Sequence, residues 1–367
     1  MNKHFEVIIV GGGISGILLA KLLSQNNVDC LVIERGNSIG DKGSYNQLAN
    51  RDILKELNLE KKYEKEKIGD IKDCFLGDGR DTPRLVSTSI DGIENDPLYL
   101  LQRKNFLNEL IKKIDGNNVL TKTNTIVNEL IIENEKIIGV RTDKEDIFSN
   151  LVILAEGGNS LLLKKTGLRK GEARPEETVL FIEEVVEVDP LLVRRKLELD
   201  SSPPFLLKIF SEHINEKDSL AYVVFSQNLL SFTLGISLAK LILLDKNINL
   251  ILEEIKSNPL FCEIVKDKKT LSFSSYILPS VIHRKDLPKL CVDGCLVIGA
   301  ATMAIAPTSL DLIQDVYSSA QIAVNAIIKA KKLNDFSRKI LTQYEGEVIK
   351  LLDKRNKGLK APVLLEK

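Results

Sequence analysis

The sequence lacks an excess of either charge. Lysine and arginine together number 51, and aspartate and glutamate together also number 51, so the formal net charge is zero. Proteins that bind nucleic acids or anionic membranes by charge carry a basic surface, and this composition supplies none. We therefore expect no nucleic-acid partner.

Residues that bind metals are also scarce. The three histidines, His4, His213 and His283, each lack a second ligand at metal spacing, and the cysteines show no paired C-x-x-C motif. The five cysteines are Cys30, Cys74, Cys262, Cys291 and Cys295. We expect no metal site, and this cysteine usage favours a reducing, cytoplasmic setting. For His283 and Arg284 a surface loop is favoured over a contact near a cofactor.

A membrane-spanning run is missing as well. The longest apolar run, Leu229 to Leu244, is about 16 residues long and contains Lys240, whereas a bilayer span needs about 20 residues. It is more typical of a core strand followed by a turn. The N-terminus shows no basic region or cleavage site of a signal peptide, so we expect a cytoplasmic protein with no transmembrane segment. Peripheral contact with a membrane through a second domain stays open.

The first 34 residues carry the most specific signal. An apolar run from Phe5 to Val10 ends at glycines, helical spacing follows from Ser15 to Leu23, and Val28 to Ile33 predicts a second strand. Residues 11 to 16 read Gly-Gly-Gly-Ile-Ser-Gly, the dinucleotide fingerprint in its proper strand–turn–helix context. Gly11 allows the tight turn, Gly13 lets a pyrophosphate approach the backbone, and Gly16 allows the helix to pack closely.

Glu34 ends the second predicted strand. An acidic residue at this position accepts hydrogen bonds from the adenosine ribose, and it disfavours a phosphorylated ribose. Gly12 and Ser15 belong to the same turn and are candidate cofactor contacts with Gly11, Gly13 and Gly16. The fingerprint alone leaves NAD and FAD open as the dinucleotide.

The middle of the chain predicts two kinds of sheet. Strand-like runs at 118–123, 126–133 and 136–142 indicate an antiparallel meander, and 151–155 indicates a short buried strand. Residues 172–234 and 236–293 contain no glycine and mix strand-like with helical patterns, which favours a separate α+β cap. Long helices are predicted at 311–331 and 337–352.

The predicted fold class is α/β. It comprises a discontinuous dinucleotide-binding Rossmann-like domain and an α+β cap with an antiparallel sheet. We expect the dinucleotide-binding domain at 1–68, 100–167 and 284–335, the cap at 69–99 and 168–283, and a C-terminal helix at 336–367.

Two further motifs favour FAD over NAD. Residues 151–160 resemble the "A-D-G-x-x-S" motif of two-dinucleotide flavoproteins, with Glu156 in the acidic place, and residues 297–301 lie where that group carries "G-D-A". Residues 34–42 resemble the "E-R-G-x-x-x-G-x-K" of FixC-like proteins, and Arg103 resembles their arginine at a helix start. The chain thus resembles FixC-like flavoprotein dehydrogenases of the electron-transfer-flavoprotein:quinone oxidoreductase and geranylgeranyl reductase superfamily. The resemblance implies that the dinucleotide-binding domain is an FAD-binding Rossmann-like domain of the glutathione-reductase type.

The resemblance implies a set of contacts with FAD. The glycines of the fingerprint would hold the pyrophosphate and Glu34 the ribose. The remaining contacts would come from Arg35, Lys42, Arg103, Val127 (through its backbone, to the adenine), Gly299 and Ala300. Ala300 stands where the family has an aspartate that meets the ribityl chain, and the segment after Lys42 lacks a glycine pair of the family. No catalytic residue is named, because the flavin itself carries hydride chemistry.

Three functions follow from the resemblance. The first is an FAD-dependent oxidoreductase that passes electrons from an electron-transfer flavoprotein toward quinone or a small ferredoxin. A separate ferredoxin is implied because no cysteine follows Cys295, where the larger quinone oxidoreductases carry an iron–sulfur domain. The second is a polyprenyl reductase, although the chain has no tryptophan for the aromatic cap motif of those enzymes. The third is a flavin-free binding or scaffold subunit.

Cys291 and Cys295 present a separate alternative. They flank Val292-Asp-Gly294, which predicts a hairpin turn that would make them neighbours. A redox pair needs an exposed thiolate of low pKa, and nothing in the sequence indicates one. Two buried thiols beside a turn are therefore favoured.

Overall fold

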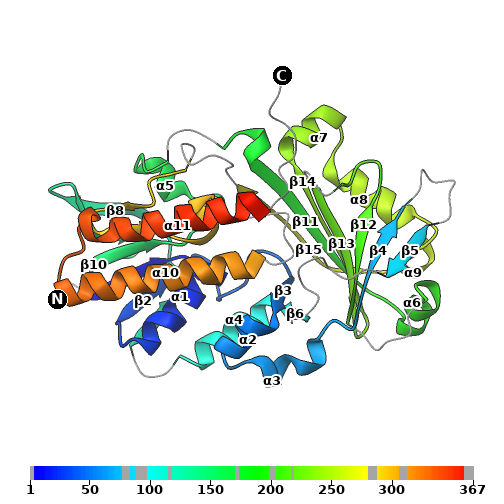
Figure 1. Cartoon of the computed structure of the whole chain (residues 1–367), viewed down its shortest axis with the longest axis horizontal. Coiled ribbons are helices and arrows are strands. Elements are labelled where there is room, and N and C mark those ends of the chain that lie inside the picture. The colour runs from blue at the N-terminus through cyan, green and yellow to red at the C-terminus, as the bar shows by residue number, and fades with distance from the viewer. Residues whose placement is uncertain are drawn as a thin grey trace.

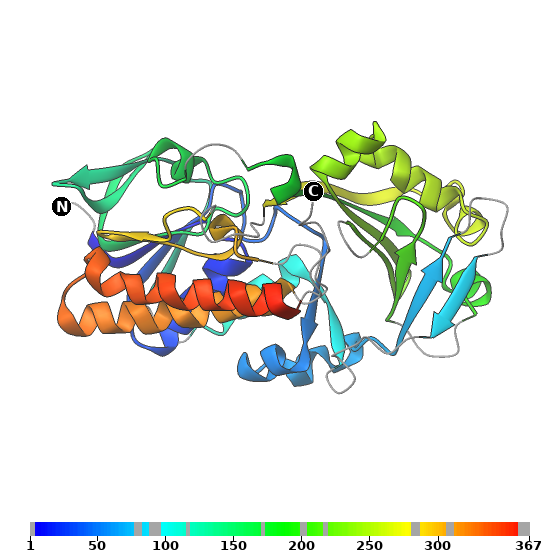
Figure 2. The ribbon, with the colours of Figure 1, turned by 45° about the horizontal axis from the view of Figure 1, so that its top comes forward.

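The protein forms two large β-sheets with helices on their outer faces, as seen in a computed structural model (Figures 1 and 2). The structure describes residues 4–76, 83–87, 97–114, 118–169, 173–198, 204–215, 219–279, 287–305 and 312–358. His283 and Arg284, considered above as a possible cofactor contact, lie outside these residues.

The strands and helices are as follows. The strands are β1 (His4–Val10), β2 (Cys30–Ile33), β3 (Asn46–Asn50), β4 (Asp70–Phe75), β5 (Arg84–Ser87), β6 (Leu98–Gln102), β7 (Val119–Lys122), β8 (Val127–Glu133), β9 (Lys136–Thr142), β10 (Asp146–Leu154), β11 (Thr178–Glu187), β12 (Phe205–Phe210), β13 (Ser219–Ser226), β14 (Leu229–Ser237), β15 (Thr270–Pro279), β16 (Cys291–Val292) and β17 (Cys295–Val297). The α-helices are α1 (Ile14–Gln25), α2 (Arg51–Glu56), α3 (Glu60–Tyr63), α4 (Arg103–Lys112), α5 (Leu161–Lys165), α6 (Pro190–Lys196), α7 (Leu238–Leu244), α8 (Ile248–Ser257), α9 (Cys262–Val265), α10 (Leu312–Leu333) and α11 (Arg338–Gly358). Short 3-10 turns are η1 (Glu64–Glu66), η2 (Pro175–Glu177) and η4 (Gly299–Thr302).

The first sheet is the predicted dinucleotide-binding sheet. Its order is β16-β17-β10-β1-β2-β7, with β9 and β8 extending from β10, and the run from β17 to β7 is parallel. Strands buried on both faces read as continuous apolar runs, as the first strand does. The fold class predicted from the sequence is confirmed.

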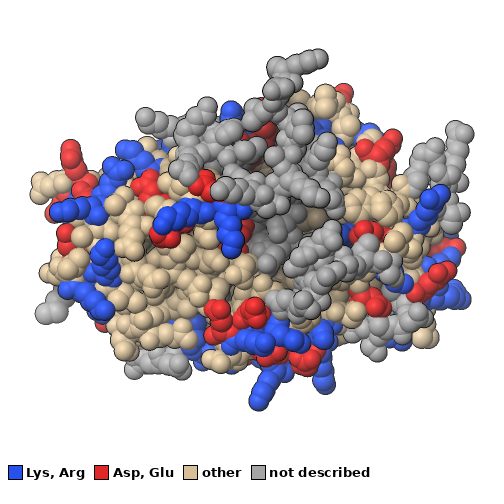
Figure 3. Space-filling model, viewed as in Figure 1, with Lys and Arg blue, Asp and Glu red and all other residues tan. Residues whose placement is uncertain are grey.

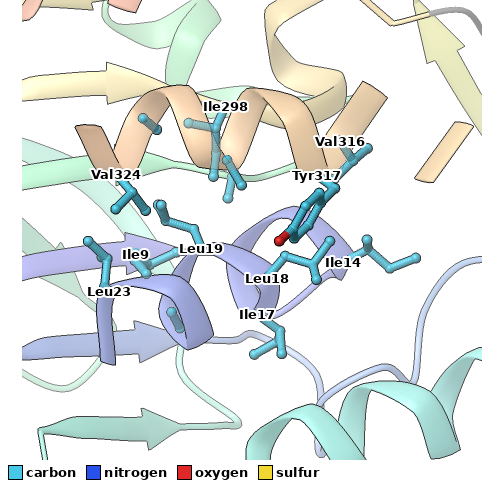
Figure 4. Packing of buried hydrophobic residues seen from close by; sticks show 14 of the residues in the cluster. Ile9, Ile14, Ile17, Leu18, Leu19, Leu23, Ile298, Val316, Tyr317 and Val324 are labelled. Carbon is cyan, nitrogen blue, oxygen red and sulfur yellow. The ribbon is translucent and has the colours of Figure 1, made fainter. Parts of the chain in front are cut away.

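Helices α1 and α10 cover one face of this sheet. In Figure 4, Leu19 of α1 lies beside the sheet residue Ile9 and below Val324 of α10, and Leu18 of α1 lies below Tyr317 of α10. Each fully buried aliphatic side chain contributes roughly 1.5–3 kcal/mol relative to an exposed one. This packing fixes the first turn of α1 against the end of β1, and it therefore sets the position of the glycine fingerprint.

The second sheet has the order β15-β11-β14-β13-β12-β4-β5. It is antiparallel except where β12 pairs with β4 in parallel. Helices α7, α8 and α9 lie on its outer face, at the upper right of Figure 1, over a core that includes Phe232 and Phe261. Its other face turns toward the first sheet. The exact domain boundaries stay a prediction.

Two expectations about single elements were wrong. The run at 118–123 is not part of a meander, because β7 pairs in parallel with β2 after the crossover through α4; only β8, β9 and β10 form the meander. The apolar run from Leu229 does not end in a turn but continues from β14 into α7, since the Ser237 side chain accepts a hydrogen bond from the Lys240 N–H and caps the helix. Apolar periodicity reports neither the long-range pairing of β7 nor the serine cap of α7.

Cys291 and Cys295 flank a tight turn, as predicted, but they do not face each other. Cys291 is opposite Leu296 in the β16–β17 pair, so Cys291 and Cys295 lie on opposite faces of the ribbon. Both thiols are free and buried. Burial raises the pKa of Cys291 to about 12 and raises that of Cys295 as well, so the reading as two buried thiols beside a turn is confirmed.

Neither a membrane span nor a charged patch stands out. No helix in the described ranges is long and apolar enough to cross a membrane. On the face in Figure 3, basic and acidic side chains are intermixed around the rim, and neither sign forms a large patch. The cytoplasmic location stays a prediction.

Candidate functional site

A cavity of about 920 Å³ lies between the first sheet and the inner face of the second. This is near the upper end of the roughly 300–1,000 Å³ range of ligand sites. Ten of the twelve residues predicted to bind the cofactor line its wall: Gly11, Gly12, Gly13, Ser15, Glu34, Arg35, Lys42, Arg103, Val127 and Ala300. Gly16 and Gly299 lie behind the wall and not in it. The structure thus gathers residues from distant parts of the sequence around one space.

The glycines of the fingerprint differ in what surrounds them. Gly11 has a φ of +113°, and a Cβ there would lie 2.4 Å from the carbonyl oxygen of Ala155. A Cβ at Gly16 would lie 2.0 Å from the Gly11 oxygen, so Gly16 is needed for helix packing. Gly13 faces open space, with the Arg103 Nη2 atom 3.6 Å from its Cβ position. A side chain at Gly13 would therefore enter the cavity without disturbing the core.

Glu34 is held in place by the backbone. Its Oε2 atom accepts a hydrogen bond from the Gly12 N–H at 2.8 Å, and its Oε1 atom accepts one from the Gly36 N–H at 2.7 Å. Each carboxylate oxygen can accept more than one hydrogen bond, so acceptor capacity remains. Glu34 therefore presents a fixed acceptor beside the glycine turn, as the sequence predicted for a ribose contact.

Arg103 opens α4 and points into the same space. Burial lowers the pKa of the Arg103 guanidinium, and the neighbouring Tyr276, Glu183 and Glu34 oppose that shift. Among the described residues its buried Nε atom has no hydrogen-bond partner. A buried donor without a partner costs about 1–3 kcal/mol, so this atom marks a place for an acceptor on a ligand. The Nη2 atom of the same guanidinium lies 3.6 Å from the Cβ position of Gly13, where it fits an anionic group.

Two more of the predicted cations line the wall, and both are exposed. Arg35 follows Glu34 at the end of β2, and Lys42 follows Asp41 in the loop before β3. Asp41 itself is paired with Lys104 at 2.6 Å and with Ser38, and these hydrogen bonds lower the pKa of Asp41 to about 2. Asp41 therefore orders the loop that carries Lys42. Val127 lines the wall at the start of β8.

Glu156, the acidic residue of the second motif, caps a helix. Its carboxylate accepts hydrogen bonds from the Ser160 hydroxyl and from the Leu162 N–H, and Ser160 in turn caps α5. Burial raises the pKa of Glu156, and these hydrogen bonds oppose the shift. Glu156 therefore shapes the cavity wall by fixing the turn before α5.

The motif at residues 297–301 packs directly against the glycine fingerprint at residues 11–16. Gly299 has a φ of +64°, and a Cβ there would lie 1.9 Å from the Ser15 Oγ atom. Ala300 follows it in the cavity wall. Within the described part of the chain, the acidic side chains of the wall are Glu34, Asp41 and Glu156, so Ala300 stands without a substitute carboxylate from those residues.

Sequence reasoning missed the wall formed by the second sheet. Phe181 and Tyr276 stack there with ring centroids 5.2 Å apart and an interplanar angle of 4°, and Tyr222 and Ser274 lie beside them. Aromatic residues in strands usually belong to a core, so single residues gave no signal. The adjacent acids Glu183 and Glu184 within an otherwise apolar strand are the one local pattern that could have indicated a functional face.

The comparisons agree with this geometry. A family model described as an NAD(P)-binding Rossmann-like domain matches residues 9–55. Protein FixC of Escherichia coli K12 is 24% identical over 356 residues, which are 93% of this chain and 80% of FixC. A probable electron transfer flavoprotein-quinone oxidoreductase, YdiS, of the same organism is 23% identical over 95% of this chain and 82% of its own length.

The fold has solved counterparts. A geranylgeranyl bacteriochlorophyll reductase-like protein of Thermoplasma acidophilum superposes with a TM-score of 0.75 and 18% identity, covering 98% of this chain and 89% of that one. Other structures with this fold are described as a flavin-dependent brominase and a probable FAD-dependent monooxygenase. At such identities the likeness concerns the fold. The chain is thus similar to the FixC proteins along nearly its whole length, and it shares the fold of proteins described as flavin-dependent.

Proposed function

We propose that the cavity binds FAD through the residues predicted from the sequence. The observation that carries this proposal is the Arg103 guanidinium, whose Nη2 atom lies 3.6 Å from the open Cβ position of Gly13 and whose buried Nε has no partner among the described residues, a set of donors and a space that suit a pyrophosphate. Glu34 would accept from the ribose hydroxyls, and Gly299 and Ala300 would border the ribityl chain. Arg35, Lys42 and Val127 would contact the rest of the cofactor.

We further propose that electrons pass from an electron-transfer flavoprotein to this FAD and on to a quinone or a small ferredoxin. The names FixC and electron transfer flavoprotein-quinone oxidoreductase of the relatives support this route. When bound, FAD supplies the redox chemistry, and the protein positions it and excludes water. The aromatic wall of Phe181, Tyr222 and Tyr276 would cover the cofactor from the second sheet.

The first test is the visible absorption spectrum of the purified protein before and after FAD is added and removed by desalting. We expect flavin bands that survive desalting. Gly13→Val is the matched variant, because Gly13 has an extended backbone and open space beside it, so the fold should remain while the cavity narrows. A wild-type protein that stays colourless would contradict FAD binding and favour the scaffold alternative.

The electron route needs its own test. Reduced electron-transfer flavoprotein would be mixed with the FAD-loaded protein and ubiquinone-1, and its reoxidation followed by absorbance. We expect reoxidation to depend on both partners, with the Gly13→Val protein as the background rate. If the electron-transfer flavoprotein is reoxidised at the same rate with and without the FAD-loaded protein, the proposed electron route is contradicted. The proposal that the cavity binds FAD would be unaffected.

The polyprenyl reductase alternative is supported by the fold of one neighbour and by apolar residues of the cavity wall such as Leu220 and Ile277. The same FAD-loaded protein, reduced with dithionite, would be offered geranylgeraniol. Saturation of its double bonds would replace the proposed electron route with this alternative.

A further inference from the structure

Glu183 is a buried carboxylate that no part of the proposed function uses. It lies in the middle of β11 and is 1% exposed. Its oxygens accept hydrogen bonds from the backbone N–H groups of Tyr45 and Asn46, the latter at 3.1 Å, and from the Ser231 hydroxyl at 3.1 Å. Two of these donors belong to the segment that enters β3, so the contact joins the second sheet to the cavity loop.

The loop from Gly43 to Asn46 is held from its other side by Arg103. The Arg103 N–H donates to the Tyr45 carbonyl at 2.9 Å. The guanidinium fills the space beside Gly43, where a Cβ would lie 2.9 Å from Arg103 Cζ, and Gly43 has a φ of +106°. Gly43 and Ser44 line the cavity. Glu183 and Arg103 therefore fix one stretch of the cavity wall between them.

The charges of the two residues are also linked. Burial raises the pKa of Glu183, while the donors from Tyr45, Asn46 and Ser231 and the positive charge of Arg103 oppose the shift. Three donors pointing at one carboxyl group suit its charged form. The neighbouring Glu184, on the opposite face of β11, is instead paired with Lys256 at 2.8 Å. Glu183 thus binds the cavity loop and lies within the electrostatic influence of Arg103, whereas Glu184 forms an ion pair on the outer face.

We propose that Glu183 is a positioning residue for the cofactor. It fixes the cavity loop Gly43–Asn46 through two backbone N–H groups, and it partly balances the charge of Arg103 beside the cofactor. This proposal rests on FAD occupying the cavity. It predicts that the second sheet acts on the affinity and the reduction potential of FAD through one carboxylate.

The test compares Glu183→Ala and Glu183→Gln with Glu184→Gln, a change of a buried acid on the other face of the same strand. Three quantities are measured: the dissociation constant of FAD, the reduction potential of the bound flavin, and the hydrogen exchange of the Tyr45 and Asn46 amides without FAD. Glu183→Ala should weaken FAD binding about tenfold or more, because it leaves two amides and the Arg103 charge uncompensated. Its Tyr45 and Asn46 amides should exchange faster.

Glu183→Gln separates charge from shape. The substitution retains a side-chain acceptor, so the dissociation constant of FAD should stay within about threefold of that of the wild type. It removes the negative charge that partly balances Arg103, so the reduction potential of the flavin should become more positive, because the positive charge of Arg103 favours the reduced, more negative cofactor. Glu184→Gln should leave all three quantities unchanged even where it lowers thermal stability.

Two outcomes would overturn the proposal. The first is that the Glu183 and Glu184 substitutions change the three measured quantities equally. The second is that Glu183→Gln leaves the flavin reduction potential unchanged and Glu183→Ala leaves the exchange of the Tyr45 and Asn46 amides unchanged. Either outcome would show that Glu183 is an ordinary core residue. A wild-type protein that binds no FAD would instead overturn the proposed function, and with it the cofactor role of Glu183. The exchange of the Tyr45 and Asn46 amides would still report whether Glu183 anchors the loop.

Discussion

Single atoms decide what each residue around the cavity tolerates. Gly13 and Gly16 are three residues apart in one motif, yet a Cβ at Gly16 would lie 2.0 Å from a backbone oxygen, whereas one at Gly13 would meet nothing nearer than 3.6 Å. Backbone atoms of a packed turn cannot move aside cheaply, so Gly16 serves the fold. Gly13 serves the space that the ligand would occupy.

Ala300→Asp is expected to tighten FAD binding by about tenfold, because a charged acceptor contributes about 1.5–3 kcal/mol when it is paired. Ala300 lines the cavity, and the aspartate would stand where the resembling family has one. Titration of the purified protein with FAD, followed by flavin fluorescence, measures the change. Binding that is weaker than wild type would show that the ribityl chain does not approach this position.

Thiol reactivity gives a second prediction at this scale. Cys30, Cys74, Cys291 and Cys295 are buried, and burial raises the pKa of Cys30 and of Cys74 to about 12, so their thiolates are scarce at neutral pH. Cys262 is only partly buried. We expect an aromatic disulfide reagent at pH 8 to titrate about one thiol in the native protein, all five after denaturation, and none in native Cys262→Ser.

Sequence reasoning named residues of the cavity wall where backbone conformation dictates the residue type. Gly11 and Glu34 could be assigned because a tight turn and a ribose contact require those residue types at that spacing. Glu183 and Tyr276 could not, because their role depends on which strand of the second sheet faces the cavity. That choice is made by pairing between strands far apart in the chain, which spacing along the sequence does not encode.

The pairing of β7 and the length of α11 differ from what the sequence pattern predicts. The crossover through α4 brings β7 back in parallel beside β2, although its sequence looks like the meander that follows. Helix α11 extends to Gly358, beyond the predicted end at 352, and the residues after Leu352 are polar, charged or glycine, so apolar periodicity does not report them. Periodicity therefore identified the elements, but not the partner of β7 or the end of α11.

Tyr344 ties α11 to the first sheet. Its hydroxyl donates a hydrogen bond to the Val297 carbonyl of β17 at 2.6 Å, and the side chain is fully buried. Tyr344→Phe should lower the free energy of unfolding by about 0.5–1.5 kcal/mol. Urea denaturation followed by circular dichroism measures the change, and a stability equal to wild type would mean that the buried carbonyl finds another donor.

Gly346→Ala is the matched change in the same helix. Gly346 is exposed, and a Cβ there meets nothing within 4 Å. Replacing a helical glycine by alanine removes a conformational cost of about 0.5–1 kcal/mol, so the variant should be more stable than wild type by that amount. We therefore expect Tyr344→Phe to lower the free energy of unfolding and Gly346→Ala to raise it, which would distinguish the effect of a buried hydrogen bond from that of helix propensity. A Gly346→Ala protein less stable than wild type would contradict the exposed position of Gly346.

At the scale of the whole molecule, the cavity draws its wall from both sheets. A ligand that binds only the folded protein stabilises it by an amount that grows with ligand concentration. FAD at 100 times its dissociation constant should therefore add about 2.7 kcal/mol and raise the Tm. Thermal unfolding followed by circular dichroism tests this, with Gly13→Val expected to show no increase at the same concentration. If FAD raised the Tm of the wild-type and Gly13→Val proteins equally, FAD would be binding outside this cavity.

The two sheets are interleaved along the chain, and this affects how the protein can be made. Strand β4 ends at Phe75 and its neighbour β5 at Ser87, yet β12, the other partner of β4, begins at Phe205, and β17 of the first sheet comes later still. During translation neither sheet can be completed until its last strands have been synthesised. Such pairing between strands far apart in the sequence slows folding. A break in the polypeptide anywhere between Ser87 and Phe205 leaves each fragment with part of both sheets, so neither sheet can be expressed as one uninterrupted piece.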